Sequence, residues 1–306
     1  MSFSSTNFET YKGKELIMQL GLGISIFLPR PFSATRDAVW ELWRNYIALV
    51  GKDRFTWARL GGGNRSRLAD ASAFRTIEAW LTGKKSFGKN CWISIHDGPM
   101  DCLGKHSFEL EGLGEPNDDE EDVNFIDIGL PVSFLDTLGG PELANRLIGL
   151  VGKLPFLCGM AGFIFHRSPY KFDDVIGKIA ALSQRFEGVE VSASEREKYW
   201  AGKGLVSVNW ITFLGNDLLA RLGGSASLQK KMPPDCVARV VDHGVAIRAG
   251  DMPLLGDKNT GRDELGLWRM VYKIVKPVQF VNPVYEFDPF QFDGNRTAKW
   301  LRRLDV

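Results

Sequence analysis

The sequence has little of what a metal centre, a disulfide scaffold or a redox site requires. It holds four cysteines and four histidines in 306 residues. Cys91, Cys102, Cys158 and Cys236 are widely spaced without a CxxC pair, so we expect free and mostly buried thiols. The histidines are too dispersed in sequence to imply a shared metal ion. The sequence therefore predicts no metal and no cofactor.

Long apolar runs and an excess of one charge are missing as well. The longest apolar runs, 16–28 and 154–165, are interrupted and fall short of the roughly 20 residues that cross a bilayer. Residues 1–10 lack the basic start and unbroken apolar stretch of a secretory signal. Lys and Arg total 38 against 37 for Asp and Glu, so no global basic field holds nucleic acid. We expect a cytoplasmic protein whose partners include neither a membrane nor nucleic acid.

Local signatures of catalysis are also absent. No GxGxxG follows a strand-like run, and neither HExxH nor GxSxG occurs. No Asp or Glu has Lys two positions later, as a metal-dependent nuclease of the restriction-enzyme type would carry. The neighbours His96-Asp97 and Asp242-His243 are poor indications of a catalytic dyad. We predict that the chain is not an enzyme, and a hydrolase-like enzyme of undetected mechanism stays open as the alternative.

Apolar side chains are plentiful, and their spacing predicts helices. The hydrophobic fraction is 44%, with 20 Phe and 9 Trp, which suits a large packed core. Apolar residues recur at helical spacing over 35–50, 71–81 and 173–186. The faces of the first and third helices should bury Trp43, Tyr46, Ile179 and Leu182.

Strand-like runs alternate with these helices without a regular βαβ rhythm. They cover 16–28, 91–95, 106–110, 123–128, 157–165 and 206–213, with a further apolar run at 237–247 and a helix at 141–151. The runs at 91–95 and 106–110 could pair as a hairpin. We predict an α+β fold with mixed or antiparallel sheets and packed helices.

An acidic stretch, 115–122, is too charged to be buried and is predicted to be a solvated loop. We expect a single domain, 1–306, and the loop could join two lobes at about 10–114 and 123–306. Leu138-Gly139-Gly140 and Leu222-Gly223-Gly224 suggest one strand-helix-strand plan used twice, with chance similarity as the alternative.

The C-terminal half carries a set of motifs in a distinctive order. They lie at 209–215, 218–224 and 244–259, followed by Trp268-Arg269 and apolar positions up to Val278. These segments resemble the TsiV-type family of type VI secretion immunity proteins. Motif glycines at 215, 223, 224, 250 and 256 are expected at element ends, where glycine adopts positive φ with least strain. Asp257 should cap a turn through its side chain.

The resemblance implies a protein that binds and neutralises a cognate toxin effector, encoded by the adjacent gene and of a nuclease type that acts in the cytoplasm. Inhibition would occlude the active site of the toxin. The residues expected to contact this partner form the acidic run, Asp118, Asp119, Glu120, Glu121 and Asp122, which could imitate nucleic-acid phosphates. As an alternative, the acidic run could be solvated and contact no partner. For the whole protein, a role as a structural component of the secretion machinery also stays open. Nothing in the sequence bears on oligomeric state.

Overall fold

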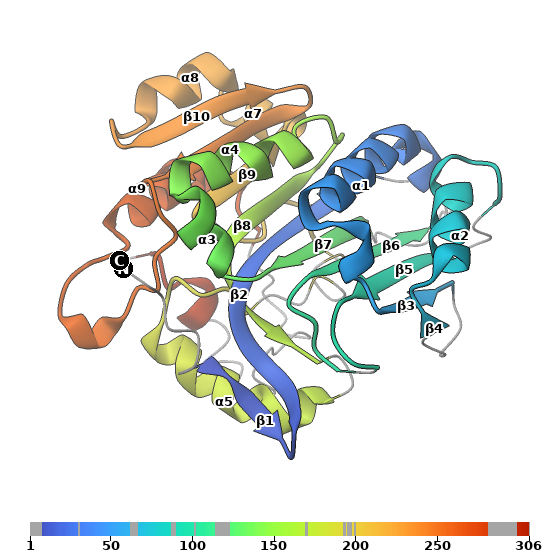
Figure 1. The fold of residues 1–306 in the computed structure, drawn as a ribbon. Coiled ribbons are helices and arrows are strands. Elements are labelled where there is room, and N and C mark those ends of the chain that lie inside the picture. Colours follow the sequence, from blue (N-terminus) through green and yellow to red (C-terminus); the bar gives the residue numbers. More distant parts are fainter. Residues whose placement is uncertain are drawn as a thin grey trace.

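One antiparallel sheet organises the molecule, and helices cover it (Figure 1). The computed structural model describes residues 8–29, 31–61, 67–86, 90–100, 102–113, 123–168, 171–191, 194, 198, 200–280 and 299–305. Within these residues the sheet has 11 strands in the order β10-β11-β9-β8-β2-β7-β6-β5-β3-β4, and β1 pairs with the start of β2. This confirms the predicted α+β fold.

The first seven strands come from the N-terminal part of the chain. They are β1 Thr10–Lys12, β2 Glu15–Leu28, β3 Trp57–Leu60, β4 Arg67–Leu68, β5 Asn90–His96, β6 Ser107–Leu113 and β7 Asn124–Leu130. The long strand β2 pairs with β7 along one edge and with β8 along the other. The predicted hairpin is confirmed, because β5 and β6 pair antiparallel with Ile93 opposite Leu110.

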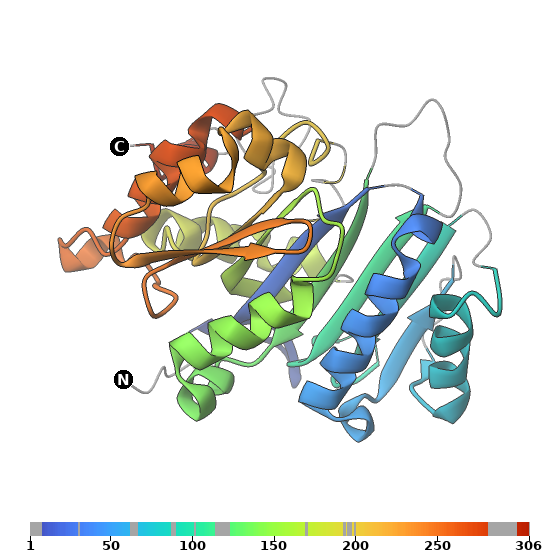
Figure 2. The same cartoon turned by 90° about the horizontal axis from the view of Figure 1, so that it is seen from above.

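Two helices pack side by side on this part of the sheet, as the periodicity predicted. They are α1 Arg36–Val50 and α2 Ala71–Leu81, and Figure 2 shows both over the same face of the strands. Trp43 and Tyr46 of α1 are buried, and the Trp43 ring meets the Phe108 ring of β6 edge to face at 4.9 Å. Asp70 caps α2 by accepting a hydrogen bond from the Ala73 N–H.

The C-terminal part supplies four strands and most of the remaining helices. The strands are β8 Cys158–Arg167, β9 Ile211–Gly215, β10 Cys236–Val241 and β11 Gly244–Ala249. The helices are α3 Ser133–Leu138, α4 Gly140–Val151, α5 Phe172–Arg185, α7 Asn216–Arg221, α8 Gly224–Lys231 and α9 Gly266–Val275. Short 3₁₀ turns are η2 Phe32–Ala34, η3 Lys52–Arg54, η5 Lys258–Thr260 and η6 Lys276–Val278. In α5, Ile179 is buried and Leu182 is partly buried against the core.

The two Leu-Gly-Gly repeats occupy equivalent places in the chain. Each lies between two short helices, α3 and α4 in one case and α7 and α8 in the other. Gly139 and Gly223 both have positive φ, of 72° and 89°, which glycine adopts at little cost. Each helix pair joins two strands that flank one antiparallel strand: β7 and β8 flank β2, while β9 and β10 flank β11. Strands of both expected lobes join this one sheet, and the division into lobes stays a prediction.

Two apolar segments differ from the strands expected of them. Of 206–213, only the part from Ile211 onward is in strand β9. Asn209 precedes it, where its side-chain oxygen accepts from the Trp210 N–H at 2.7 Å and its own N–H donates to the Thr212 hydroxyl at 3.3 Å. Such local bonds compete with pairing between strands. The run at 237–247 is a hairpin that turns between Val241 and Gly244.

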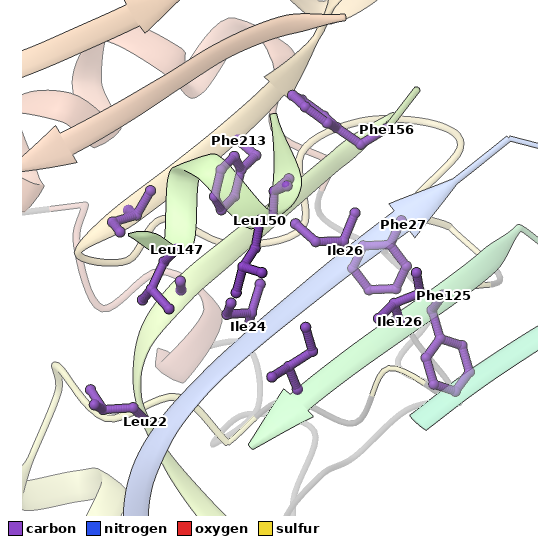
Figure 3. Close-up of a cluster of buried hydrophobic side chains, with 14 of the residues drawn as sticks. Leu22, Ile24, Ile26, Phe27, Phe125, Ile126, Leu147, Leu150, Phe156 and Phe213 are labelled. Carbon is purple, nitrogen blue, oxygen red and sulfur yellow. The ribbon is translucent and has the colours of Figure 1, made fainter. Parts of the chain in front are cut away.

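The core lies between the sheet and the helices. Leu22, Ile24 and Ile26 of β2 are buried in the same cluster as Leu147 and Leu150 of α4, and Figure 3 shows these side chains together. Cys102, Cys158 and Cys236 are buried free thiols. Within the described residues no helix is long and apolar enough to span a membrane.

The motif residues shape turns, with one exception. The Oδ1 of Asp257 accepts from the Asn259 N–H at 3.0 Å, which confirms the expected cap. Gly223, Gly224, Gly250 and Gly256 have positive φ. Gly215 ends strand β9 as expected, but its φ is −65°, so it lacks the positive φ that was expected of it. It is required for a different reason, because a Cβ there would lie 2.4 Å from the Phe156 carbonyl oxygen.

Candidate functional site: a polar trough on the sheet

Strand alternation places polar side chains on the face of the sheet that α1 and α2 leave open. In β6, Phe108 and Leu110 are buried on the helix side, whereas Glu109 is half-buried on the other side. In β5, Trp92 and Ser94 are half-buried in the same way. Asp127 takes the equivalent position in β7, between the buried Ile126 and Ile128.

Register aligns these residues in one line across five strands, which we call the polar row. It consists of Arg59 on β3, Ser94 on β5, Glu109 on β6, Asp127 on β7 and Ser25 on β2. Each neighbouring pair is directly opposed, so their Cβ atoms lie about 4.5–5.5 Å apart. The row forms the middle of a cavity of about 330 Å³, which we call the polar trough.

The walls of the polar trough come from distant parts of the chain. Besides the polar row, its lining includes Trp92, His96, Cys102, Leu103, Gly104, Ser107, Ile164, His166, Arg167 and Ser194. Gly23 and Gly129 lie in the floor, where they add no side chain. The trough is therefore concave, and polar and apolar side chains line it together.

Trp92 is held in place from two directions. Its indole N–H donates a hydrogen bond to Glu109 Oε1 at 3.0 Å. The guanidinium of Arg59 lies over its ring, 4.1 Å from the centroid. These contacts fix an aromatic side chain beside the two central carboxylates of the polar row.

The other end of the row is tied to the segment after β8. The Ser194 hydroxyl donates to Asp127 Oδ1 at 2.8 Å. The Lys198 ammonium pairs with Glu111 Oε1 at 2.5 Å, on the same face of β6 but outside the trough lining. These two contacts connect β7 to Ser194 and β6 to Lys198, both of which lie shortly before Trp200 in the chain.

An aspartate–histidine pair fixes the rim between β5 and β6. Asp97 Oδ2 lies 2.6 Å from His106 Nδ1, and Asp97 Oδ1 accepts from the backbone N–H groups of Lys105 and His106. Burial raises the pKa of Asp97, but the hydrogen bonds from His106 and Lys105 outweigh it, and the net pKa is lowered. Asp97 thus pairs with His106 rather than with its sequence neighbour His96, whose Nδ1 accepts from the Gly98 N–H.

His166 covers the glycine floor from β8. A Cβ on Gly21 or Gly129 would collide with its ring. Its Nε2 lies 2.9 Å from the Leu22 carbonyl oxygen, so this nitrogen donates the hydrogen bond. Burial lowers the pKa of His166 to about 4, which leaves the imidazole neutral at pH 7.

The trough brings charged groups of both signs together. Carboxylates, guanidinium groups, hydroxyls and an indole converge there, and most are already hydrogen-bonded or stacked. Among the described residues, no group of three or more His, Cys, Asp or Glu side chains is arranged to hold a metal ion.

Residues 38–304 match the protein family TsiV, described as type VI immunity for VRR-NUC. This protein belongs to the TsiV family. The T6SS protein PA0821 of Pseudomonas aeruginosa has a similar fold, with a TM-score of 0.79 and 17% sequence identity. The match covers 97% of this chain and 87% of that chain. No curated protein matches the sequence. The family assignment identifies an immunity protein of type VI secretion.

The partner-binding residues predicted from the sequence, Asp118 to Asp122, lie outside the described residues. The chain on either side of them is β6, which ends at Leu113, and β7, which starts at Asn124. The acidic run of this TsiV-family protein thus joins two strands of the polar trough.

Sequence reasoning missed the polar trough itself. Its signal was present as polar residues at every second position, in Trp92-Ile-Ser94-Ile-His96 and Ser107-Phe-Glu109-Leu-Glu111. Their alignment into one row depends on pairing between strands, which alternation in a single strand does not reveal.

Proposed function

We propose that this protein binds a VRR-NUC nuclease effector of a type VI secretion system and neutralises it by occluding its active site. The observation that carries the proposal is the family match over residues 38–304, which spans strands β3 to β11 and the C-terminal motifs. The nuclease would act on DNA inside the bacterium, so we place the immunity protein in the cytoplasm.

Occlusion has a simple physical basis in charge. An enzyme that cuts nucleic acid must attract phosphates, so its cleft presents cationic groups. The five consecutive acidic residues at 118–122 offer the opposite charge. Opposite potentials accelerate association, and an occupied cleft excludes the substrate.

The direct test is protection in cells. The effector encoded next to this gene is expressed alone and together with the protein, and recovery of the complex on an affinity-tagged effector is followed in parallel. We expect survival and a recovered complex with both proteins present. Toxicity that persists at full expression of the protein, without a complex, would refute the proposal.

The contribution of the acidic run can be measured separately. Replacing Asp118, Asp119, Glu120 and Glu121 together by Asn or Gln should slow association with the effector and reduce its salt dependence. Thermal stability should barely change, because exposed charges alter stability by no more than about 0.5 kcal/mol each. A matched control neutralises four exposed acids on the helical side: Asp37, Asp53, Asp136 and Glu142. Equal association kinetics for both variants at low and moderate salt would remove the acidic run from the interface.

A further inference from the structure

Strand β10 lies at the outer end of the sheet, where one of its edges has no neighbouring strand (Figure 1). Among the described strands at an edge it is the longest, with six residues against two for β4 and three for β1. It contains no proline and no lysine, which proteins commonly place on edge strands to prevent pairing. Its outer edge is therefore a candidate for pairing with another strand.

Strand register decides which backbone groups of β10 point away from β11. A two-residue turn joins Val241 to Gly244, and the Gly250 N–H donates a hydrogen bond to the Asp235 carbonyl oxygen. Because bonded pairs alternate along an antiparallel ladder, the odd-numbered residues of β10 bond to β11. The even-numbered residues therefore direct their N–H and C=O groups outward.

Part of this outward edge is already hydrogen-bonded. The Cys236 N–H donates to the Pro233 carbonyl oxygen, and the Ala238 carbonyl oxygen accepts from Gln229 Nε2 at 3.4 Å. Within the described part of the chain, the Ala238 N–H and both backbone groups of Val240 have no hydrogen-bond partner. These groups, two donors and one acceptor, are available to a strand that lies alongside.

The side chains of β10 suit the same use. Val237 and Val240 keep 47% and 56% of their surfaces exposed, and strand alternation places them on opposite faces. A neighbouring strand would give each valine a cross-strand partner. Between them, Arg239 is exposed and has no ion pair among the described residues, so a carboxylate opposite it would be favoured.

The internal repeat shows what covers an equivalent edge. Strand β8 follows the helices α3 and α4 as β10 follows α7 and α8, and each lies antiparallel beside the inner strand of its unit, β2 or β11. The other edge of β8 pairs antiparallel with β9 over the four residues Cys158 to Ala161. No described strand takes that place beside β10. The repeat therefore predicts a short antiparallel strand at this edge, supplied by another molecule.

The available groups of β10 lie at the same end of the sheet as the acidic run. Strand β7 begins at Asn124, shortly after the acidic run 118–122. Register leads from there across the sheet, with opposed pairs Asn124–Leu28, Phe27–Cys158, Cys158–Leu214, Leu214–Val245 and Val245–Val240. Five strand spacings separate β7 from β10, about 24 Å, which is less than the diameter of a small domain. One partner that engages the acidic run can therefore also reach the edge of β10.

We infer that the outer edge of β10 pairs antiparallel with a short strand of the VRR-NUC effector. The inference rests on the proposed function and adds a contact surface to it. One effector residue lies opposite Val240, the next faces Arg239, and the residue three positions on faces Val237. The effector strand therefore carries the pattern apolar, acidic, any residue, apolar.

Residue-resolved amide hydrogen exchange of the full-length protein, alone and with a catalytically inactive effector, tests the pairing directly. We expect the Ala238 and Val240 amides to exchange at least about tenfold more slowly in the complex, because pairing places both N–H groups in hydrogen bonds. The Arg239 amide bonds to β11 and is the internal control, already protected in the free protein. Unchanged exchange at Ala238 and Val240 would overturn the inference. Protection of both amides in a dimer of the free protein would also overturn it, because a second copy would then be the occupant.

Affinity for the same inactive effector separates the backbone of β10 from its side chains. Val240→Pro removes an outward N–H and leaves the ladder to β11 intact, so it should bind at least about tenfold more weakly. Val240→Thr keeps the N–H and the β-branched shape and should stay within about threefold of wild type. Thermal unfolding confirms that each variant is folded.

A charge reversal tests the same edge without changing its backbone. Arg239→Glu should bind at least about tenfold more weakly, because it opposes an acidic residue of the effector. The matched control is Arg75→Glu on the exposed side of α2, which should bind as wild type does. Wild-type affinity of both Val240→Pro and Arg239→Glu would overturn the inference while leaving the proposed function intact. Equal losses for Val240→Pro and Val240→Thr would overturn it as well, because the side chain would then make the contact. If wild type neither binds the effector nor protects cells, the proposed function fails and the inference fails with it.

Discussion

Glu190 and Arg303 form an ion pair that solvent scarcely reaches, with 2% and 6% of their surfaces exposed. Arg303 Nη2 lies 3.1 Å from Glu190 Oε2, which also accepts a hydrogen bond from the Ser207 hydroxyl at 2.7 Å. Arg303 Nε donates to the Glu187 carbonyl oxygen at 2.9 Å. These bonds attach the C-terminal segment, 299–305, to Glu187 and Glu190, which follow helix α5.

We predict that Glu190→Gln lowers the free energy of unfolding by about 3–5 kcal/mol, because it leaves a buried guanidinium without its counter-charge. The measurement is urea unfolding of both proteins. The control is Arg146→Gln, which breaks the exposed Glu142–Arg146 pair of α4 and should cost about 0.5 kcal/mol or less. If both variants lost the same free energy of unfolding, burial would not determine how much the Glu190–Arg303 pair stabilises the protein.

His166 should make stability depend on pH. Its pKa is about 4 in the folded protein against an ordinary value of 6.5, so between these values the unfolded chain binds more protons. Stability therefore falls as the pH drops from about 6.5 to 4, by about 3 kcal/mol for this group. His166→Gln should remove that part of the slope. Unfolding free energies for both proteins between pH 7.5 and 4.5 check the prediction, and parallel curves would contradict it.

Among the elements, strand β9 ends at a glycine that has no room for a side chain. A Cβ on Gly215 would lie 2.4 and 2.6 Å from the carbonyl oxygens of Phe156 and Leu157. Backbone atoms cannot step aside cheaply, so Gly215→Ala should destabilise the protein by about 1–3 kcal/mol.

Gly177 within α5 offers the opposite case, since a Cβ there meets nothing within 4 Å. Gly177→Ala should stabilise the protein by about 0.5–1 kcal/mol through helix propensity and a less flexible unfolded chain. Thermal or urea unfolding of Gly215→Ala and Gly177→Ala measures whether the first destabilises and the second stabilises the protein. A neutral Gly215→Ala would show that β9 can shift away from Phe156.

The elements that sequence predicted best are those whose apolar residues repeat over several turns. Helices α1, α2 and α5 follow this pattern because each packs one face on the sheet. The segment before Ile211 is as apolar as a strand, yet Asn209 and Thr212 bond to the local backbone instead. Composition alone does not distinguish a strand from such a locally bonded segment, because the difference depends on which hydrogen-bond partners the fold brings near.

At the scale of the whole molecule, the polar trough depends on long-range order that one sequence does not show. Ser25 and Asp127 are about a hundred positions apart in the chain but directly opposed in the sheet. The family motifs at 209–259 were visible in the sequence, and they form turns and packed strands away from the polar trough. Motifs therefore predicted the scaffold, whereas the trough became visible only through strand register.

The measurement that tests this account most directly is DNA cleavage by the purified VRR-NUC effector, titrated with the protein at several DNA concentrations. If the protein occludes the active site, one equivalent should stop cleavage at low DNA, and more should be needed as DNA rises, because the two compete for one cleft. Full cleavage in the presence of excess protein, or inhibition that is independent of DNA concentration, would contradict occlusion.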